Sequence, residues 1–498
     1  MALPVCGSRS TDPKRDIVTI TLAAAATPEP KPDPILAVVK PEAQPAGEVA
    51  EGDKRSDLAA SGTPSAGRTT LDEAKRKGPG GFLQLLGPGL ITGASDDDPS
   101  GIGTYSQVGS QFGYGLLWLA LFTFPLMSAI QELCARIALQ TGVGLGASLQ
   151  RKFPRLVVGL AITGLVAANT FNVGADLGAV AAAGSLLSRG ALLALWLVVP
   201  VALLIITLQV FATYAAIFKI FKWLTLALFA YVITAFFAHP PLLEVFKATI
   251  IPHIELSKDF IMALVAVLGT TISPYLFFWQ ASSEVDELAA AGATNPQVGR
   301  QGLKRAELRA ARADVMIGMA FSNLVMYFII LTSAAVLHAH GKTDVQTADQ
   351  AAAALAPIAG PFAFIVFSVG LIGAGLLAIP ILTGSATYAI KEFLGLPGSL
   401  ASKLQHRPTF YLILTLATAA GVAMNFVHLD PIRALFISAV INGVVAPPLL
   451  LLIVLLGADA AVMKRYVSGR LSLALTGIAT VFMAVAAITM FVTMFAGH

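Results

Sequence analysis

Apolar residues occur in long runs along most of the chain, and short polar stretches separate these runs. From Gly81 onward each run has about 20 residues, which is the length that an α-helix needs to cross a bilayer. The pattern predicts about eleven spans, near residues 83–107, 113–138, 155–184, 191–209, 213–237, 259–283, 313–337, 361–390, 408–427, 431–456 and 470–494. We therefore expect an all-α membrane protein.

Two of these runs are interrupted in the middle. The first contains GASDDDPSGIG (93–103), and the sixth contains GTTISPY (269–275). Proline and glycine disfavour a continuous helix, and a broken helix is tolerated in a membrane only around a cavity or an ion site. Secondary transporters carry two such breaks at matching positions of inverted repeats. The spacing predicts a 5+5 inverted repeat, about 83–237 and 259–456, followed by one extra helix at 470–494.

Composition agrees with this division of the chain. Of the 498 residues, 56% are hydrophobic and 12% are charged, whereas soluble proteins carry about 25% charged residues. Residues 1–79 are rich in Ala, Pro, Glu and Lys and are predicted to be a disordered cytoplasmic tail, before a transporter domain at 80–498. The small net charge of +4 gives no indication of a nucleic-acid partner.

Lysine and arginine distinguish the two ends of the predicted spans. Most of them fall in alternate loops, such as LDEAKRKG (71–78) and the long loop between the sixth and seventh spans. The opposite loops carry few: Arg189, Lys247, Lys258 and Lys342, with Arg433 at a span end. Because cytoplasmic loops are enriched in these residues, we expect a multi-pass protein of the cytoplasmic membrane, with a cytoplasmic N-terminus and an external C-terminus.

The two breaks offer only oxygen ligands. A carboxylate at the bilayer centre must face a cavity or a partner, which makes Asp98 the first candidate metal ligand, followed by Asp97 and Asp96. Thr270 and Ser273 offer hydroxyls from the sixth span, and no histidine falls in the middle of a span. Oxygen ligands suit hard cations such as Mg²⁺, Mn²⁺ or Ca²⁺. Most of these residues also have an alternative role that does not involve metal. Asp98 could cap a helix, and Asp97 could line a solvated vestibule. The two hydroxyls could donate hydrogen bonds to backbone carbonyls that the helix break leaves free.

Three further polar residues are candidates for the path of an ion or proton. Asp176 lies in the third span, where a paired structural aspartate is the alternative. Tyr275 follows the second break and is otherwise a packing residue, and Asn442 in the tenth span could instead join two helices. Glu284, Asp286 and Glu287, just after the sixth span, are interpreted as the start of a solvated loop.

At these motifs the chain resembles the Nramp family of divalent metal transporters. GPGLITGASDDDPSGIG is similar to the first-span segment of that family, ARIALQTGVGLGASL to the exit of its second span, GTTISPYLFF to its sixth-span break, and LTGSATYAIKEFLG to a late motif. The likeness runs from about Gly87 to the end of the last span. It implies a leucine-transporter-like fold and metal uptake.

The departures from the family pattern point to a harder ion. The asparagine ligand of the family falls on Gly101, which has no side chain. Gly101 is still included in the predicted metal site. The methionine of the sixth span falls on Ser273, the following histidine on Tyr275, and a frequent glutamate of the third span on Ala179. These departures resemble the Nramp-related branch associated with magnesium, and they argue against proton coupling.

The sequence thus predicts a transporter that imports Mg²⁺ or Mn²⁺ by alternating access, with the metal ion and the bilayer as partners. It predicts no resident cofactor and no enzymatic activity, and it leaves the oligomeric state open. The alternatives are a proton-coupled Mn²⁺/Fe²⁺ symporter, an amino-acid transporter of the same fold, which three adjacent aspartates disfavour, and a metal sensor that does not transport.

Overall fold

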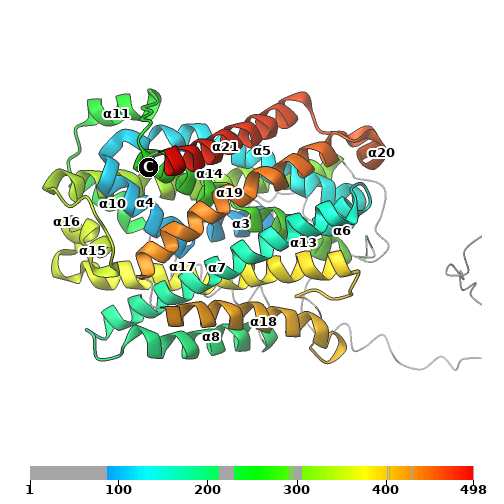
Figure 1. The fold of residues 1–498 in the computed structure, drawn as a ribbon, viewed down its shortest axis with the longest axis horizontal. Helices are drawn as coiled ribbons and strands as arrows, with labels where there is room; N and C mark the ends of the chain where they lie inside the picture. Colours follow the sequence, from blue (N-terminus) through cyan, green and yellow to red (C-terminus); the bar gives the residue numbers. More distant parts are fainter. Residues whose placement is uncertain are drawn as a thin grey trace, which may run out of the picture. The chain divides into compact units, whose positions relative to one another are not determined.

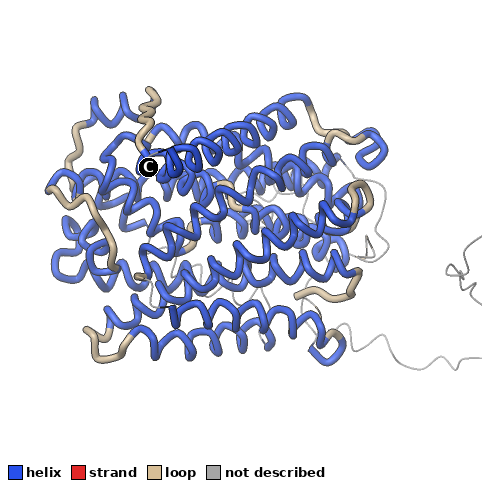
Figure 2. Tube along the Cα trace, in the orientation of Figure 1, coloured by secondary structure: helices blue, strands red, loops and turns tan. Residues whose placement is uncertain are grey.

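The computed structural model describes residues 87–211, 229–290, 292, 294, 305–400, 402, 404–427 and 430–496. Every regular element in these ranges is a helix (Figure 2). The predicted tail at 1–79 lies outside the described residues, and so does most of the predicted fifth span, of which α10 (Phe229–Phe237) is described. Residues 291, 293 and 295–304 of the long loop between the sixth and seventh spans are also outside them.

Eight helical segments of the described part are long and apolar enough to cross a membrane. They comprise α5 (Trp118–Thr141), α7 (Arg155–Leu187), α8 (Ala194–Phe211), α12 with α13 (Lys258–Thr271 and Pro274–Ala290), α14 (Arg305–Val336), α17 (Ala363–Leu394), α19 (Pro431–Gly457) and α21 (Arg470–Ala496). The shorter apolar helix α18 spans Pro408–Met424. In Figure 1, α7 and α17 run side by side, while α8 and α18 lie along one edge.

The first span is divided as the sequence predicts. Helix α3 (Pro88–Asp96) ends before Asp97, and α4 (Pro99–Phe112) begins two residues later. Asp98 is the N-cap of α4, and its Oδ1 accepts a hydrogen bond of 2.7 Å from the Gly101 N–H. Pro99 follows at the first helical position, where its missing N–H costs nothing. The break is therefore a well-capped helix start.

The sixth span is divided in the same way. Helix α12 (Lys258–Thr271) ends before Ile272, and α13 begins at Pro274. Helix α4 packs against α14, and α13 packs against α5. These pairs occupy equivalent places in the two predicted repeats.

Several boundaries differ from the prediction, including the end of α4 at Phe112 and not at 107. Helix α5 begins at Trp118 and not at 113, because a 3₁₀ turn at Gly113–Leu116 comes first and Gly113 has a φ of 56°. Helix α14 begins at Arg305 and not at 313, since RAELRAARAD is rich in good helix formers. Helix α13 continues to Ala290, beyond the predicted end at 283. Short helices absent from the prediction join the spans: α6 (Leu145–Gln150), α11 (Leu242–Ile250), α15 (Ala348–Ala352), α16 (Ala356–Ala359) and α20 (Ala460–Met463).

Helices α3 and α14 are in close backbone contact. A Cβ added at Gly93 would overlap the backbone of Gly318, and one added at Gly318 would overlap the carbonyl of Gly89. Small residues permit this approach between membrane helices. The Asp314 carboxylate of α14 also accepts hydrogen bonds from three backbone N–H groups at the start of α3: Gly87 (2.9 Å), Gly89 (2.7 Å) and Leu90 (3.0 Å). The first half of the divided span is thus fastened to α14.

Candidate functional site

The two helix breaks lie against each other. The Tyr275 hydroxyl, at the start of α13, donates a hydrogen bond of 2.9 Å to the Ser95 carbonyl and lies 3.4 Å from Oδ2 of Asp98. A Cβ added at Gly101 would lie 3.2 Å from Oγ1 of Thr270. The breaks of the first and sixth spans therefore form one buried polar region. Tyr275 joins them by hydrogen bonds, in addition to packing.

Asp98 is the centre of this region and is 1% exposed. One carboxylate oxygen caps α4, and the other accepts a hydrogen bond of 3.0 Å from Nδ2 of Asn172. The orientation of Asn172 is fixed in turn, because its Oδ1 accepts a hydrogen bond of 2.7 Å from Ser438. Helices α4, α7, α13 and α19 thus all contribute to the surroundings of one carboxylate.

Asp96 and Asp97 face a different neighbour. The Ser322 hydroxyl of α14 donates a short hydrogen bond to Oδ2 of Asp96 and lies 3.4 Å from Oδ1 of Asp97. The other oxygen of each carboxylate is buried and makes no hydrogen bond to a described residue. The three adjacent aspartates therefore diverge, with Asp98 turned toward α7 and the other two toward α14.

Asp176 lies one helical turn beyond Asn172 on the same face of α7. Its carboxylate interacts electrostatically with Asp98 and with the Ser100 backbone N–H. It is fully buried, and neither of its oxygens makes a hydrogen bond within the described part of the chain. The third span thus brings an amide and a second carboxylate to the break.

The remaining candidates, Ser273, Thr270 and Asn442, differ in whether their side chains make hydrogen bonds. Ser273 donates hydrogen bonds of 2.8 Å to the carbonyls of Gly269 and Thr270, so its proton is used within its own span. This contact matches the alternative role that the sequence left open, and metal contact by Ser273 stays a prediction. Oγ1 of Thr270 and Oδ1 of Asn442 are buried without a partner among the described residues.

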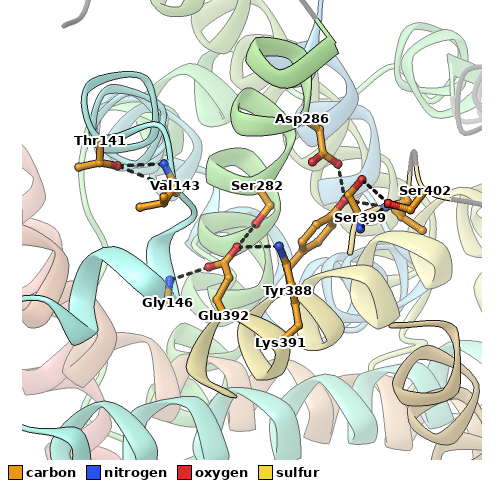
Figure 3. Close-up of polar contacts among 11 residues, drawn as sticks. Thr141, Val143, Gly146, Ser282, Asp286, Tyr388, Lys391, Glu392, Ser399 and Ser402 are labelled. Atoms are coloured by element: carbon orange, nitrogen blue, oxygen red, sulfur yellow. Dashed lines mark hydrogen bonds and ion pairs between the residues drawn. The ribbon is translucent and has the colours of Figure 1, made fainter. Parts of the chain in front are cut away.

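A second polar cluster lies where the ends of α13 and α17 meet α6 (Figure 3). The Glu392 carboxylate accepts hydrogen bonds from the Gly146 N–H (2.9 Å) and the Ser282 hydroxyl (3.2 Å). The Tyr388 hydroxyl donates to Asp286 and accepts from the Leu400 N–H. The interpretation of Glu284, Asp286 and Glu287 as a loop start is wrong, because α13 continues through them. Glu284 is also buried, at 1% exposed, and Glu287 alone of the three is exposed as expected.

The sequence analysis missed three residues of the site: Asn172, Ser322 and Ser438. Asn172 carried a signal, since it lies four residues before Asp176 and so shares its helix face. Ser322 and Ser438 carried none, because single serines in apolar helices are common. Within the described residues, no three side chains of His, Cys, Asp or Glu form a cluster that could hold a metal ion. A cation at the breaks would therefore be bound by few carboxylates, together with neutral oxygens.

Comparison with known proteins places this site in a family. The sequence model described as "Natural resistance-associated macrophage protein-like", Nramp, matches residues 89–493. Among similar proteins is a divalent metal cation transporter MntH of Erwinia tasmaniensis, 27% identical over 66% of this chain and 78% of its own. A second MntH, from Klebsiella pneumoniae, is 27% identical over 72% of this chain and 82% of its own.

A solved structure agrees on the fold. A manganese transporter of Eremococcus coleocola has 18% sequence identity and a TM-score of 0.63, over 82% of this chain and 87% of that one. The leucine-transporter-like fold that the family resemblance implied is thereby confirmed. Since the family model matches most of the sequence, from the first divided span to the last helix, the chain belongs to the Nramp family.

Proposed function

We propose that the chain imports a hard divalent cation, Mg²⁺ or Mn²⁺, across the cytoplasmic membrane by alternating access, with the ion held between the two helix breaks. The chain belongs to a family of transporters and is not an enzyme. The similar MntH proteins are named for divalent metal cations. The distribution of Lys and Arg favours a cytoplasmic N-terminus and an external C-terminus.

One observation carries the choice of ion. Around the breaks, Oδ1 of Asp96, Oδ2 of Asp97 and Oδ1 of Asn442 are buried oxygens that make no hydrogen bond to a described residue, and the buried Asp176 carboxylate has only the Ser100 backbone N–H as a neighbouring donor. Buried polar atoms normally have partners, and a group of acceptors without them is best satisfied by a cation or its water. Neither break contains Met, Cys or His. Such a site favours hard ions over softer transition metals.

The contacts of Asp98 support a central role for it in the proposed site. It lies between α4, α7 and α13, and its charge is held by the Asn172 amide and not by a cationic side chain. A partly hydrated Mg²⁺ is commonly bound by one or two carboxylates together with its remaining waters. Asp98, supported by Asp97, Asp96 and the carbonyls beside Gly101, fits that requirement. Thr270 and Ser273 complete the site from the sixth span.

The test is metal uptake by proteoliposomes that contain the purified full chain. We expect uptake of Mg²⁺ and Mn²⁺, and Asp98→Ala should abolish it while the protein remains monodisperse. Asp98→Asn is the milder variant, because the amide oxygen still caps α4, while the charge and the oxygen that accepts from Asn172 are lost. Full uptake by Asp98→Asn would refute the proposed role of the carboxylate.

A second function is favoured by the comparisons. The relatives named above are MntH proteins, and a similar solved structure is that of a manganese transporter, so a proton-coupled Mn²⁺/Fe²⁺ symporter is the alternative. The Asp176 carboxylate is then the residue to carry the proton. Recording internal pH during metal uptake separates the two functions, since a symporter acidifies the interior and the transporter proposed here does not.

A further inference from the structure

A cavity of about 330 Å³ with charged side chains in its lining lies at the end of α4 that is remote from Asp98. It is lined by α4, α12, α19 and the loop before α15. Its charged side chains are Asp259, Asp344 and Arg433, and Gln107 and Gln111 of α4 contribute amides. No ion pair joins Arg433 to either carboxylate in the part of the chain that the structure describes. These charges therefore act on the cavity and do not neutralise one another.

The loop over the cavity is held in place by α4. Oε1 of Gln107 accepts a hydrogen bond of 2.9 Å from the Val345 N–H, next to Asp344. Nε2 of Gln107 lies 3.4 Å from Oε1 of Gln111, and Gln346 donates to Asp344. The carboxylate of Asp344 is thus positioned at the rim of the cavity, although the loop itself is exposed.

A polar stripe along α4 leads from this cavity to the helix break. Ser100, Thr104, Gln107 and Gln111 follow one another at helical spacing and share one face. The stripe is about 16 Å long at 1.5 Å per residue. Beside it, Leu435 of α19 packs where a Cβ of Gly103 would lie.

The hydroxyls on the stripe indicate that it contacts water or an ion. Most threonines of the spans, including Thr123, Thr170 and Thr418, donate to the carbonyl one turn earlier. Thr104 is fully buried and its hydroxyl makes no hydrogen bond to a described residue, whereas the Ser100 hydroxyl, at the break, interacts with the Asp98 carboxylate. Because a buried hydroxyl needs a partner, the Thr104 hydroxyl is a candidate to bind water or a passing cation.

We propose that this cavity is an external antechamber, which binds the hydrated divalent cation before the ion moves along the α4 stripe to Asp98. The proposal rests on the proposed function and adds a second binding site to it. Six waters occupy about 180 Å³, so a fully hydrated ion fits the cavity. Two carboxylates and two amides can accept or donate hydrogen bonds to those waters, and binding through water needs no direct ligand cluster.

The cavity contains charges of both signs, so substitutions of its acidic and basic residues should change the KM for uptake in opposite directions. Asp259→Asn and Asp344→Asn should each raise the KM for Mn²⁺ and Mg²⁺ uptake about threefold to tenfold, because a divalent ion loses an attraction a few ångströms away in water. Arg433→Gln removes a repulsion and should lower the KM by a similar factor. Uptake is measured in cells that express the full chain, with metal added outside, and added salt should shrink each difference.

The control is Asp349→Asn, which makes the same change of charge on α15, outside the cavity. Its KM should equal that of the unsubstituted chain. An unchanged KM in both aspartate variants and in Arg433→Gln would overturn the antechamber. The result is separable from the proposed function, which stands if Asp98→Asn abolishes uptake and fails if the unsubstituted chain moves no metal.

The stripe has its own pair of variants. Thr104→Val keeps the shape of the side chain and removes the hydroxyl, so the maximal uptake rate should fall several-fold. Ser106→Ala removes a buried hydroxyl from the opposite face of the same helix, where it interacts with Tyr231 and not with the stripe, and should leave the rate unchanged. Equal rates for Thr104→Val and the unsubstituted chain would exclude the stripe as the route.

Discussion

At the scale of single residues, Asn172 is the neighbour that fixes the orientation of the Asp98 carboxylate. Its Nδ2 donates to Asp98 and its Oδ1 accepts from Ser438, so the amide cannot turn without losing both bonds. A hydrogen bond to a charged group contributes about 1.5–3 kcal/mol. We infer that Asn172 fixes the carboxylate while leaving its charge available to an ion.

Removing this amide should impair metal binding more than folding. We expect Asn172→Ala to raise the KM for metal uptake about tenfold or more, because Asp98 loses its donor and its fixed position. Asn169→Ala is the matched control, since Asn169 lies one turn earlier on α7 and donates to the Leu382 carbonyl, away from the break. Equal KM values for the two variants would contradict the role given to Asn172.

Ser273 permits a prediction about ion preference. A methionine at this position would offer a thioether, which favours softer metals over Mg²⁺. Ser273→Met should therefore shift uptake toward Mn²⁺, Fe²⁺ or Cd²⁺. Ser273→Ala removes the same hydroxyl without adding sulfur and should not shift it. Competition assays with paired metals measure the preference, and identical preferences for both variants would remove Ser273 from the site.

The positions of the two breaks could be predicted from sequence, but most contacts between them could not. Runs such as DDDPSG and GTTISP interrupt a helix through their proline and glycine residues. The breaks at Asp98 and Pro274 can therefore be located from the sequence alone. The partners of Asp98 come from α7 and α19, and one sequence does not say which buried Asn or Ser faces which break. For the same reason the divergence of Asp96 and Asp97 from Asp98 was not foreseen.

At the scale of helices, the contact between α3 and α14 depends on the absence of side chains. Gly89 and Gly93 of α3 face Gly318 of α14 so closely that any Cβ there would meet backbone atoms. Backbone atoms cannot turn aside as a flexible side chain can. The first half of the divided span is therefore held by shape as well as by the Asp314 hydrogen bonds.

A branched side chain in this contact should loosen the divided span. We expect Gly318→Val to destabilise the protein by about 1–3 kcal/mol, as overpacking does in other tightly packed interiors. Thermal unfolding of the purified protein in detergent measures the effect. Gly477→Ala is the control: within the described part of the chain, no atom beyond the local backbone of α21 lies within 4 Å of a Cβ at Gly477, and alanine favours a helix there by up to about 1 kcal/mol. A melting temperature for Gly318→Val equal to that of the control would contradict the contact.

Helix ends were the least predictable elements. The predicted start of the seventh span at 313 followed hydrophobicity, whereas α14 begins at Arg305 because helix formation does not require apolar residues. The same limit applies to α13, whose polar last turns reach Ala290 and bury Glu284 against neighbouring helices. Hydrophobic periodicity locates the part of a helix inside the membrane and not its continuation beyond it.

At the scale of the whole molecule, the distribution of positive charge predicts the orientation in the membrane. With Cys6 and Cys134 replaced by serine, Lys342→Cys should react with a membrane-impermeant maleimide in intact cells. Arg465→Cys should react only after permeabilisation, since it lies on the predicted cytoplasmic side. Both positions are exposed, so access to each side of the membrane decides the outcome. The reverse labelling pattern would invert the proposed direction of transport.

The Asp314 carboxylate has a consequence for how opening of the site can be observed. Three amide protons, those of Gly87, Gly89 and Leu90, share this one acceptor residue. Any motion that carries α3 away from α14 must release all three at once and expose them to deuterium. Hydrogen–deuterium exchange at residues 87–90 should therefore be slow while the site is closed and faster in proportion to the time it spends open, which makes the fastening point of α3 an internal reporter of the transport cycle.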